Sequence, residues 1–162
     1  MNVRILALLL PGLLMGADLV KEVRHELVML PYYGVFDNLV YRVDGSKVAL
    51  FGEVREPQLK SDAEKAVRSI EGVSSVDNQI DVLPLSASDD STRRAVYRAI
   101  YSQSALERYQ ITSVPPIHIL VKNGDVTLEG IVATESDKSI AGIAANGAGG
   151  VHRVVNNLRT DK

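Results

Sequence analysis

The chain contains an internal repeat, and no other feature of the sequence restricts its fold as strongly. The segment Leu39–Ile80 aligns with Ile117–Leu158 at a constant offset of 78 residues and without a gap. Glycines align with glycines and valines with valines along this stretch, which is hard to obtain by chance. The two segments must therefore adopt the same structure, and the chain is a tandem duplication of one small unit.

Each copy is predicted to contain a β-hairpin. Apolar residues alternate along residues 47–54 and again along 125–132, which is the period of a strand with one buried face. A shorter alternating segment precedes each of them and ends in the dipeptide Asp44-Gly45 or Asn123-Gly124. Both dipeptides are strong signals for a tight turn between antiparallel strands.

Helices are predicted on both sides of each hairpin. Residues 18–30 and about 91–109 carry an apolar stripe at helical spacing before the hairpins, and Leu59 to Ile70 carry one after the first hairpin. A last strand follows in each copy. The predicted fold class is therefore α+β, with two tandem αββαβ modules, each a mixed three-stranded sheet with two helices on one face.

The second copy differs in its second helix, about residues 136–146, which contains Gly142 and is followed by further glycines. Glycine within a helix costs about 1 kcal/mol relative to alanine. We therefore expect this helix to be shorter or looser than its counterpart.

The N-terminus has the outline of a secretory signal. One positive charge precedes an uncharged apolar run, Ile5–Met15, which reaches only about 16 Å as a helix against a hydrocarbon core of about 30 Å. The alternative is an apolar N-terminal segment that is not cleaved. The predicted organisation is a signal peptide over 1–17, a first module over 18–83, a linker over 84–90 with Asp90 or Ser91 as helix N-cap, and a second module over 91–162.

The repeated motifs resemble the BON family, named for bacterial OsmY and nodulation proteins. The matching residues are VDGSKVALFGEV and VKNGDVTLEGIV, followed by GVSSVDNQI and GVHRVVNNL. The resemblance implies a periplasmic or outer-membrane-associated protein linked to phospholipid binding, envelope integrity and osmotic stress. The chain has no cysteine, so it lacks the residue that lipoprotein members use as an anchor. We therefore expect a periplasmic protein that is soluble or bound peripherally to the outer or inner membrane.

Three pairs of repeated residues are interpreted as structural. Gly52 and Gly130 lie at inward positions of a strand, where a missing side chain allows close approach of backbone or helix. Gly72 and Gly150 suit a left-handed cap where a helix stops. Asn78 and Asn156 are expected to be buried amides that satisfy backbone groups. A ligand cleft at the first pair and a ligand-binding role for the asparagines are the alternatives.

No catalytic constellation is present in the sequence. It contains neither a G-x-S-x-G nucleophile motif nor a GxGxxG phosphate-binding motif. The histidines His25, His118 and His152 share no local spacing, so no metal site and no cofactor are predicted. The net charge of −2 gives no drive toward nucleic acid. We therefore expect a binding protein and not an enzyme. A hydrolytic or metal-dependent enzyme is the third alternative, and it would need a cluster of titratable residues that the sequence does not show.

One helix of the second module combines arginines with tyrosines. Residues 84–162 include 9 basic and 8 acidic residues, against 8 and 12 in residues 18–83. Arginine binds phosphate bidentately and tyrosine favours the membrane surface, so Arg94, Tyr97, Arg98 and Tyr101 are the predicted lipid-binding residues. The alternative is an ordinary solvated helix face with aromatic packing at its rim.

The favoured function is binding of anionic phospholipid at a membrane surface in support of envelope integrity. The alternative function is a soluble periplasmic osmotic-stress protein that acts as a chaperone or protein-interaction module. That protein would use exposed sheet surface around Val40, Phe51 and Ile131 and would have an envelope protein as its partner.

Overall fold

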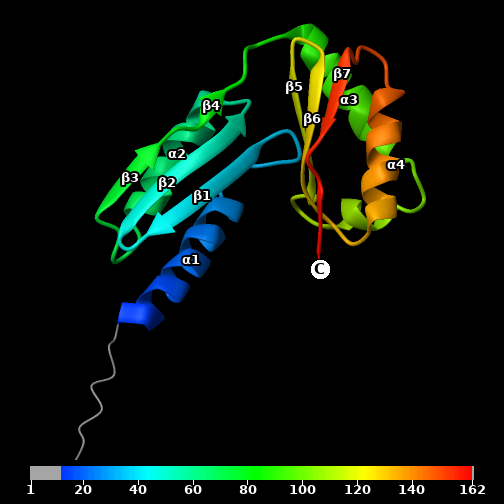
Figure 1. Ribbon diagram of the computed structural model, residues 1–162. Coiled ribbons are helices and arrows are strands. Elements are labelled where there is room, and N and C mark those ends of the chain that lie inside the picture. Colours follow the sequence, from blue (N-terminus) through cyan, green and yellow to red (C-terminus); the bar gives the residue numbers. More distant parts are fainter. Residues whose placement is uncertain (1–11, 162) are drawn as a thin grey trace, which may run out of the picture.

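The computed structural model describes residues 12–161 and contains two modules of the same design (Figure 1). The first consists of α1 (Gly12–Val28), β1 (Asn38–Asp44), β2 (Lys47–Val54), α2 (Pro57–Arg68), β3 (Ser75–Asn78) and β4 (Asp81–Val82). The second consists of α3 (Ala87–Tyr101), the 3-10 helix η1 (Glu107–Ile111), β5 (Ile117–Lys122), β6 (Asp125–Val132), α4 (Glu135–Asn146), β7 (Arg153–Asn156) and β8 (Arg159–Thr160).

The two sheets have identical topology. β1 pairs antiparallel with β2, and β3 and β4 both pair parallel with β2, as two pieces of one interrupted strand. In the second module β5, β6, β7 and β8 repeat this arrangement. The helices of each module pack together on one face of its sheet. The predicted fold class is confirmed, with each third strand divided in two.

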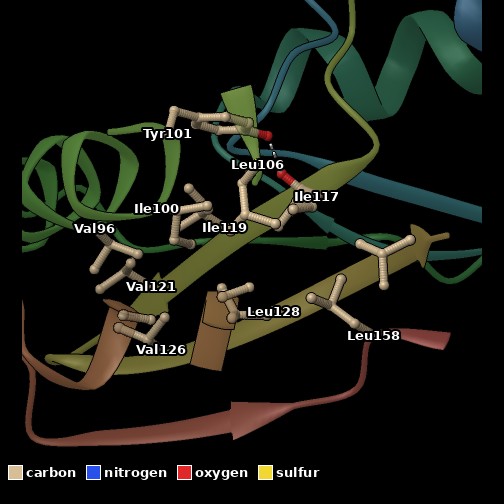
Figure 2. Close-up of a cluster of buried hydrophobic side chains, with 13 residues drawn as sticks. Val96, Ile100, Tyr101, Leu106, Ile117, Ile119, Val121, Val126, Leu128 and Leu158 are labelled. Carbon is tan, nitrogen blue, oxygen red and sulfur yellow. Dashed lines mark hydrogen bonds between the residues drawn. The ribbon is translucent and has the colours of Figure 1, made fainter. Parts of the chain in front are cut away.

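Each module has its own hydrophobic core. In the first, α1 and α2 contribute Leu19, Val23, Leu59 and Val67 to a cluster with the inward residues of the sheet. In the second, Val96 and Ile100 of α3 meet the inward side chains of β5 and β6 and Leu158 (Figure 2). Complete burial of one such side chain contributes about 1.5–3 kcal/mol relative to leaving it exposed. The two clusters are separate, so the repeated unit is also the packing unit.

The paired glycines are positions of close backbone approach. Gly52 and Gly130 have φ angles of 111° and 125°. A Cβ atom at these residues would lie 2.0 Å from the carbonyl oxygen of Asn38 or 1.9 Å from that of Pro116. A side chain at either position would therefore be both strained and in collision with the neighbouring strand.

The paired asparagines bridge a helix and the interruption in the third strand. Asn78 Nδ2 donates to the Lys60 carbonyl at 3.0 Å, and its Oδ1 accepts from the Ile80 amide at 3.2 Å. Asn156 makes the equivalent bonds to Lys138 and Leu158, at 2.8 and 3.2 Å. Both side chains satisfy backbone groups, as expected, but they are half-buried and not fully buried as predicted.

Several predicted helix limits were wrong. α1 begins before residue 18, and α3 begins at Ala87 because the Ser86 hydroxyl, and not Asp90 or Ser91, caps it by accepting from the Asp89 amide at 3.1 Å. α3 also ends at Tyr101, and a separate 3-10 turn follows. α2 ends at Arg68, so the left-handed Gly72, with φ of 89°, closes the next turn and is not the cap itself.

The expected shortening of α4 was also wrong, since α2 and α4 both have 12 residues. A Cβ at Gly142 would lie 2.7 Å from Asn156 Nδ2. The glycine therefore leaves room for the asparagine bridge, and that contact offsets its low helix propensity.

The predicted signal peptide falls mostly on residues 1–11, which lie outside the described residues. α1 includes its remaining residues, 12–17. Among residues 12–161, no helix combines the length and the apolar character that crossing a membrane requires.

The modules meet through the segment between α1 and β1, residues 31–37, which we call the docking loop. It projects from the first module onto β5 of the second (Figure 1). The Ile119 amide of β5 donates to the Val35 carbonyl at 2.8 Å. The ring of Tyr33 stacks on that of His118, with centroids 5.7 Å apart. Val35 and Phe36 also pack against the core of the second module.

Candidate functional site

The largest part of the predicted site lines a hollow of about 450 Å³ between the modules. We call this hollow the arginine groove. Its lining residues come from the docking loop, from α3 and from the segment after it: Val35, Phe36, Arg94, Tyr97, Arg98, Gln110, Thr112, Ser113 and Pro115. Three of the four residues predicted to bind lipid are therefore together, on a surface completed by the other module.

The two arginines of the groove are exposed and have few partners. Arg94 makes a long contact with the Ser91 hydroxyl at 3.3 Å, and neither Arg94 nor Arg98 forms an ion pair within residues 12–161. The preceding residue Arg93 is different, because it is buried and donates to the Val121 carbonyl and the Asp90 carboxylate at 2.6 Å each. The guanidinium groups of Arg94 and Arg98 thus remain available to an anion.

Aromatic side chains form the apolar part of the groove. Tyr97 is half-buried and meets the Phe36 ring edge-on, with centroids 6.1 Å apart. Its hydroxyl accepts a hydrogen bond from Gln110 Nε2 at 2.8 Å, which ties α3 to η1. The guanidinium of Arg55 lies 5.9 Å from the centroid of the Phe36 ring. Phe36 is therefore held from both modules.

Tyr101 does not belong to the groove, and its predicted place beside the arginines was wrong. It is the last residue of α3, is 6% exposed, and its hydroxyl donates to the Ile117 carbonyl at 3.2 Å (Figure 2). Burial raises the pKa of its phenol. The centroid of its ring lies 4.7 Å from that of the Tyr97 ring, so the buried Tyr101 packs against Tyr97 and helps to hold it in place. Tyr101 is a core residue that holds α3 to β5.

Two parts of the groove were not predicted from the sequence. One is the apolar wall that Val35 and Phe36 of the docking loop form, and the other is the polar residue Gln110 of η1. Phe36 lies more than fifty residues before the helix that was predicted to bind lipid, so no local periodicity connects them. The one available signal was the aromatic run of the docking loop, Tyr32, Tyr33 and Phe36, in a segment outside the predicted helices and strands. Apolar loop residues that no regular element explains are candidates for an interface.

The groove has the chemistry of a site for an anion with an apolar attachment. Its guanidinium groups match phosphate oxygens, the Ser113 hydroxyl supplies a further donor, and Val35, Phe36 and Pro115 line the apolar side. Within the described residues no three His, Cys, Asp or Glu side chains gather as a potential metal site. The groove thus offers binding groups, and its residues include no nucleophile paired with a base.

The sheet surface of the alternative function is only partly available. Val40 and Ile131 are each 46% exposed. Phe51 is half-buried, and the guanidinium of Arg42 lies 5.7 Å from the centroid of its ring. The exposed apolar positions belong to two different sheets and form no single defined hollow.

Comparison with known proteins gives one informative result. No curated protein matches the chain. Two solved structures of CdsD, a structural protein of the type III secretion system of Chlamydia trachomatis, are similar at a TM-score of 0.32 each, with 13% and 14% identity. Both alignments cover 90% of this chain, and 98% and 94% of the CdsD chains. Likeness at this TM-score supports no conclusion about this protein.

The sequence model of the BON domain matches the chain twice, over residues 17–84 and 89–162. These ranges follow the two structural modules and together cover most of the sequence. The protein therefore belongs to the BON domain family and carries two BON domains in tandem.

Proposed function

We propose that this protein is exported to the periplasm by its N-terminal signal and binds anionic phospholipid at a membrane surface through the arginine groove. One observation carries the proposal: Arg94 and Arg98 are exposed, have no ion pair among the described residues, and line a hollow with an aromatic side. Most arginines with a fixed structural role instead bond to a carboxylate or a carbonyl, as Arg93 does.

The expected attraction is modest and sensitive to salt. A basic residue at an anionic membrane surface contributes about 1 kcal/mol, and the contribution decays over a Debye length of about 10 Å at 0.1 M salt. Two arginines therefore give peripheral, reversible binding. Tyr97 adds an aromatic ring of the kind that settles at the membrane–water boundary.

Family membership supports the same function. BON domains are associated with phospholipid binding in the bacterial envelope, and their proteins are generally non-catalytic. Support of envelope integrity and a response to osmotic stress are the physiological roles that this binding would serve.

The decisive experiment is co-sedimentation with vesicles that contain or lack phosphatidylglycerol, at low and at high salt. Wild-type protein is expected to bind only the anionic vesicles, and less at high salt. Arg94→Glu with Arg98→Glu should abolish binding without unfolding, because both side chains are exposed.

The matched control is Lys21→Glu with Arg24→Glu, which makes the same charge change on exposed positions of α1. Binding by the control and not by the groove variant identifies α3 as the site. If both variants bind like the wild type, the groove is not the lipid site. If the wild type binds no vesicle, the proposed function is wrong.

The second candidate function is a soluble periplasmic chaperone or protein-interaction module. It is favoured by the exposure of Val40 and Ile131, which are aliphatic residues on strands. Suppression of aggregation of an unfolded client, lost in Val40→Lys with Ile131→Lys and kept in Arg94→Glu with Arg98→Glu, would establish it.

A further inference from the structure

The docking loop has two roles in the structure, because the same few residues join the modules and form the groove. Val35 accepts the hydrogen bond from the Ile119 amide, and it also lines the groove. Phe36 contacts Tyr97 across the module boundary and lines the groove beside it. The second module alone supplies the arginines but lacks this apolar wall.

The remaining contacts between the modules lie outside the groove. Tyr33 stacks on His118, and neither residue lines the groove. Leu83 of the first module and Leu120 of the second line a different small hollow, and each is 4% exposed. Docking can therefore be perturbed at His118 or Leu120 without removing any residue that faces the groove.

We infer that the arginine groove is a two-module site: its anionic ligand binds only the docked arrangement and in turn holds the two modules together. This inference rests on the proposed function, and it adds Val35 and Phe36 of the first module to the residues that contact the ligand. The ligand's phosphate lies on the arginines of α3, and its less polar glycerol part lies against Phe36.

Linkage gives this arrangement a measurable consequence. A ligand that binds one of two states shifts the population toward that state, and its apparent affinity falls in proportion to the fraction of protein in that state. Substitutions that undock the modules must therefore weaken lipid binding from a distance. A site made by α3 alone predicts no such effect.

His118→Asp tests this on the full-length protein, since it places a carboxylate against the Tyr33 ring. The equivalent position in the first module, Val40, is 46% exposed, so the sheet accepts a polar residue there without loss of its core. The matched control is Val155→Asp, which adds the same charge at a partly exposed position of β7. Circular dichroism and thermal melting check that both variants are folded.

We expect His118→Asp to lower binding to phosphatidylglycerol vesicles by about tenfold, and Phe36→Ala by a similar factor, while Val155→Asp changes binding less than about twofold. Equal binding by wild type, His118→Asp and Phe36→Ala overturns the inference. The Arg94/Arg98 double variant, measured in parallel, reports separately on the proposed function, because it removes the anion-binding groups without touching the docking contacts.

A distance measurement provides the reciprocal test. The chain has no cysteine, so Gln58→Cys on α2 and Ile143→Cys on α4 allow one nitroxide label in each module. His118→Asp combined with Leu120→Arg should broaden the distance distribution, and anionic vesicles should narrow it again. Broadening without loss of binding shows that docking is not required. An unchanged distribution shows that these contacts do not hold the modules together, which overturns the inference as well.

Discussion

The two modules have the same topology but differ where one of them touches the other. Arg42 of β1 is exposed, whereas its counterpart Leu120 of β5 is 4% exposed. Val40 is open to solvent, whereas its counterpart His118 stacks on Tyr33. The inward residues of the central strands β2 and β6, by contrast, are the same valine, leucine and glycine residues at each equivalent position. Divergence after duplication has therefore left the cores alike and has changed the outer surface of the second sheet into an interface.

The asparagine bridge between helix and strand differs between the modules in a similar way. Asn78 Nδ2 donates to both the Lys60 carbonyl and, at 3.1 Å, the Glu64 carboxylate. In the second module the residue equivalent to Glu64 is Gly142, and Asn156 keeps only the carbonyl bond of this pair. The backbone bonds are common to both copies, and the carboxylate contact is an addition of one copy.

The largest expected effect concerns what the copies share. Gly52→Val and Gly130→Val should each destabilise its module by about 3–5 kcal/mol, because the new side chain meets a backbone carbonyl and the φ angle is positive. Urea denaturation of each variant measures the free energy of unfolding. Gly149→Ala is the control, since a Cβ there meets no atom within 4 Å. A loss below about 1 kcal/mol for either valine variant would show that the close approach is not maintained.

A smaller effect is expected where the copies differ. Leu120→Ala should cost about 2–3 kcal/mol, because a buried leucine loses its contacts, while Arg42→Ala at the equivalent exposed position should change stability by less than about 0.5 kcal/mol. Thermal melting of the two variants compares them directly. Equal effects would mean that the second sheet is not covered by the first module.

The smallest effect is a dependence of docking on pH. Burial lowers the pKa of His118, while the backbone of Asp37 and Gly34 and the charge of Glu129 oppose this shift. The imidazole is freed when the modules separate, so the separated state binds a proton more readily than the docked state. Docking is therefore unaffected above the ordinary histidine pKa of about 6.5 and weakens as the pH falls through it toward the lower value of the docked state. The width of the nitroxide distance distribution, measured from pH 8 down to about pH 5, follows this change, and His118→Phe should remove it.

The fold could be predicted from the sequence because its determinants are local and occur twice. The alternating strands, the Asp44-Gly45 and Asn123-Gly124 turns and the amphipathic helices each signal their own structure, and the repeat confirms each signal. Helix ends were less predictable. The hydroxyl of Ser86 caps α3, whereas the carboxylate of Asp89 accepts hydrogen bonds from the Asn123 and Gly124 amides at 2.9 Å each. That contact across 34 residues and more cannot be seen in a local pattern.

Only the part of the site that lies on α3 could be predicted from the sequence. Helical spacing correctly placed Arg94 and Arg98 on an exposed face, and it placed Tyr101 there as well. Tyr101 is at the end of α3, where the chain turns away and its long side chain reaches β5 instead of solvent. The wall made by Phe36 depends on how two modules dock, and no periodicity within either module encodes that.

The outer edge of β5 has a consequence for behaviour in solution. Backbone groups along this edge have hydrogen-bond partners. Tyr101 donates to the Ile117 carbonyl, the Ile119 amide donates to the Val35 carbonyl, and Arg93 donates to the Val121 carbonyl. An uncapped strand edge is a template for pairing with another chain. Tyr101 and Arg93 belong to the second module itself, whereas Val35, which accepts from the Ile119 amide, belongs to the first. Each separation of the modules therefore exposes a free amide at the centre of the edge strand, and retention of the docked state protects the protein against self-association as well as forming its groove.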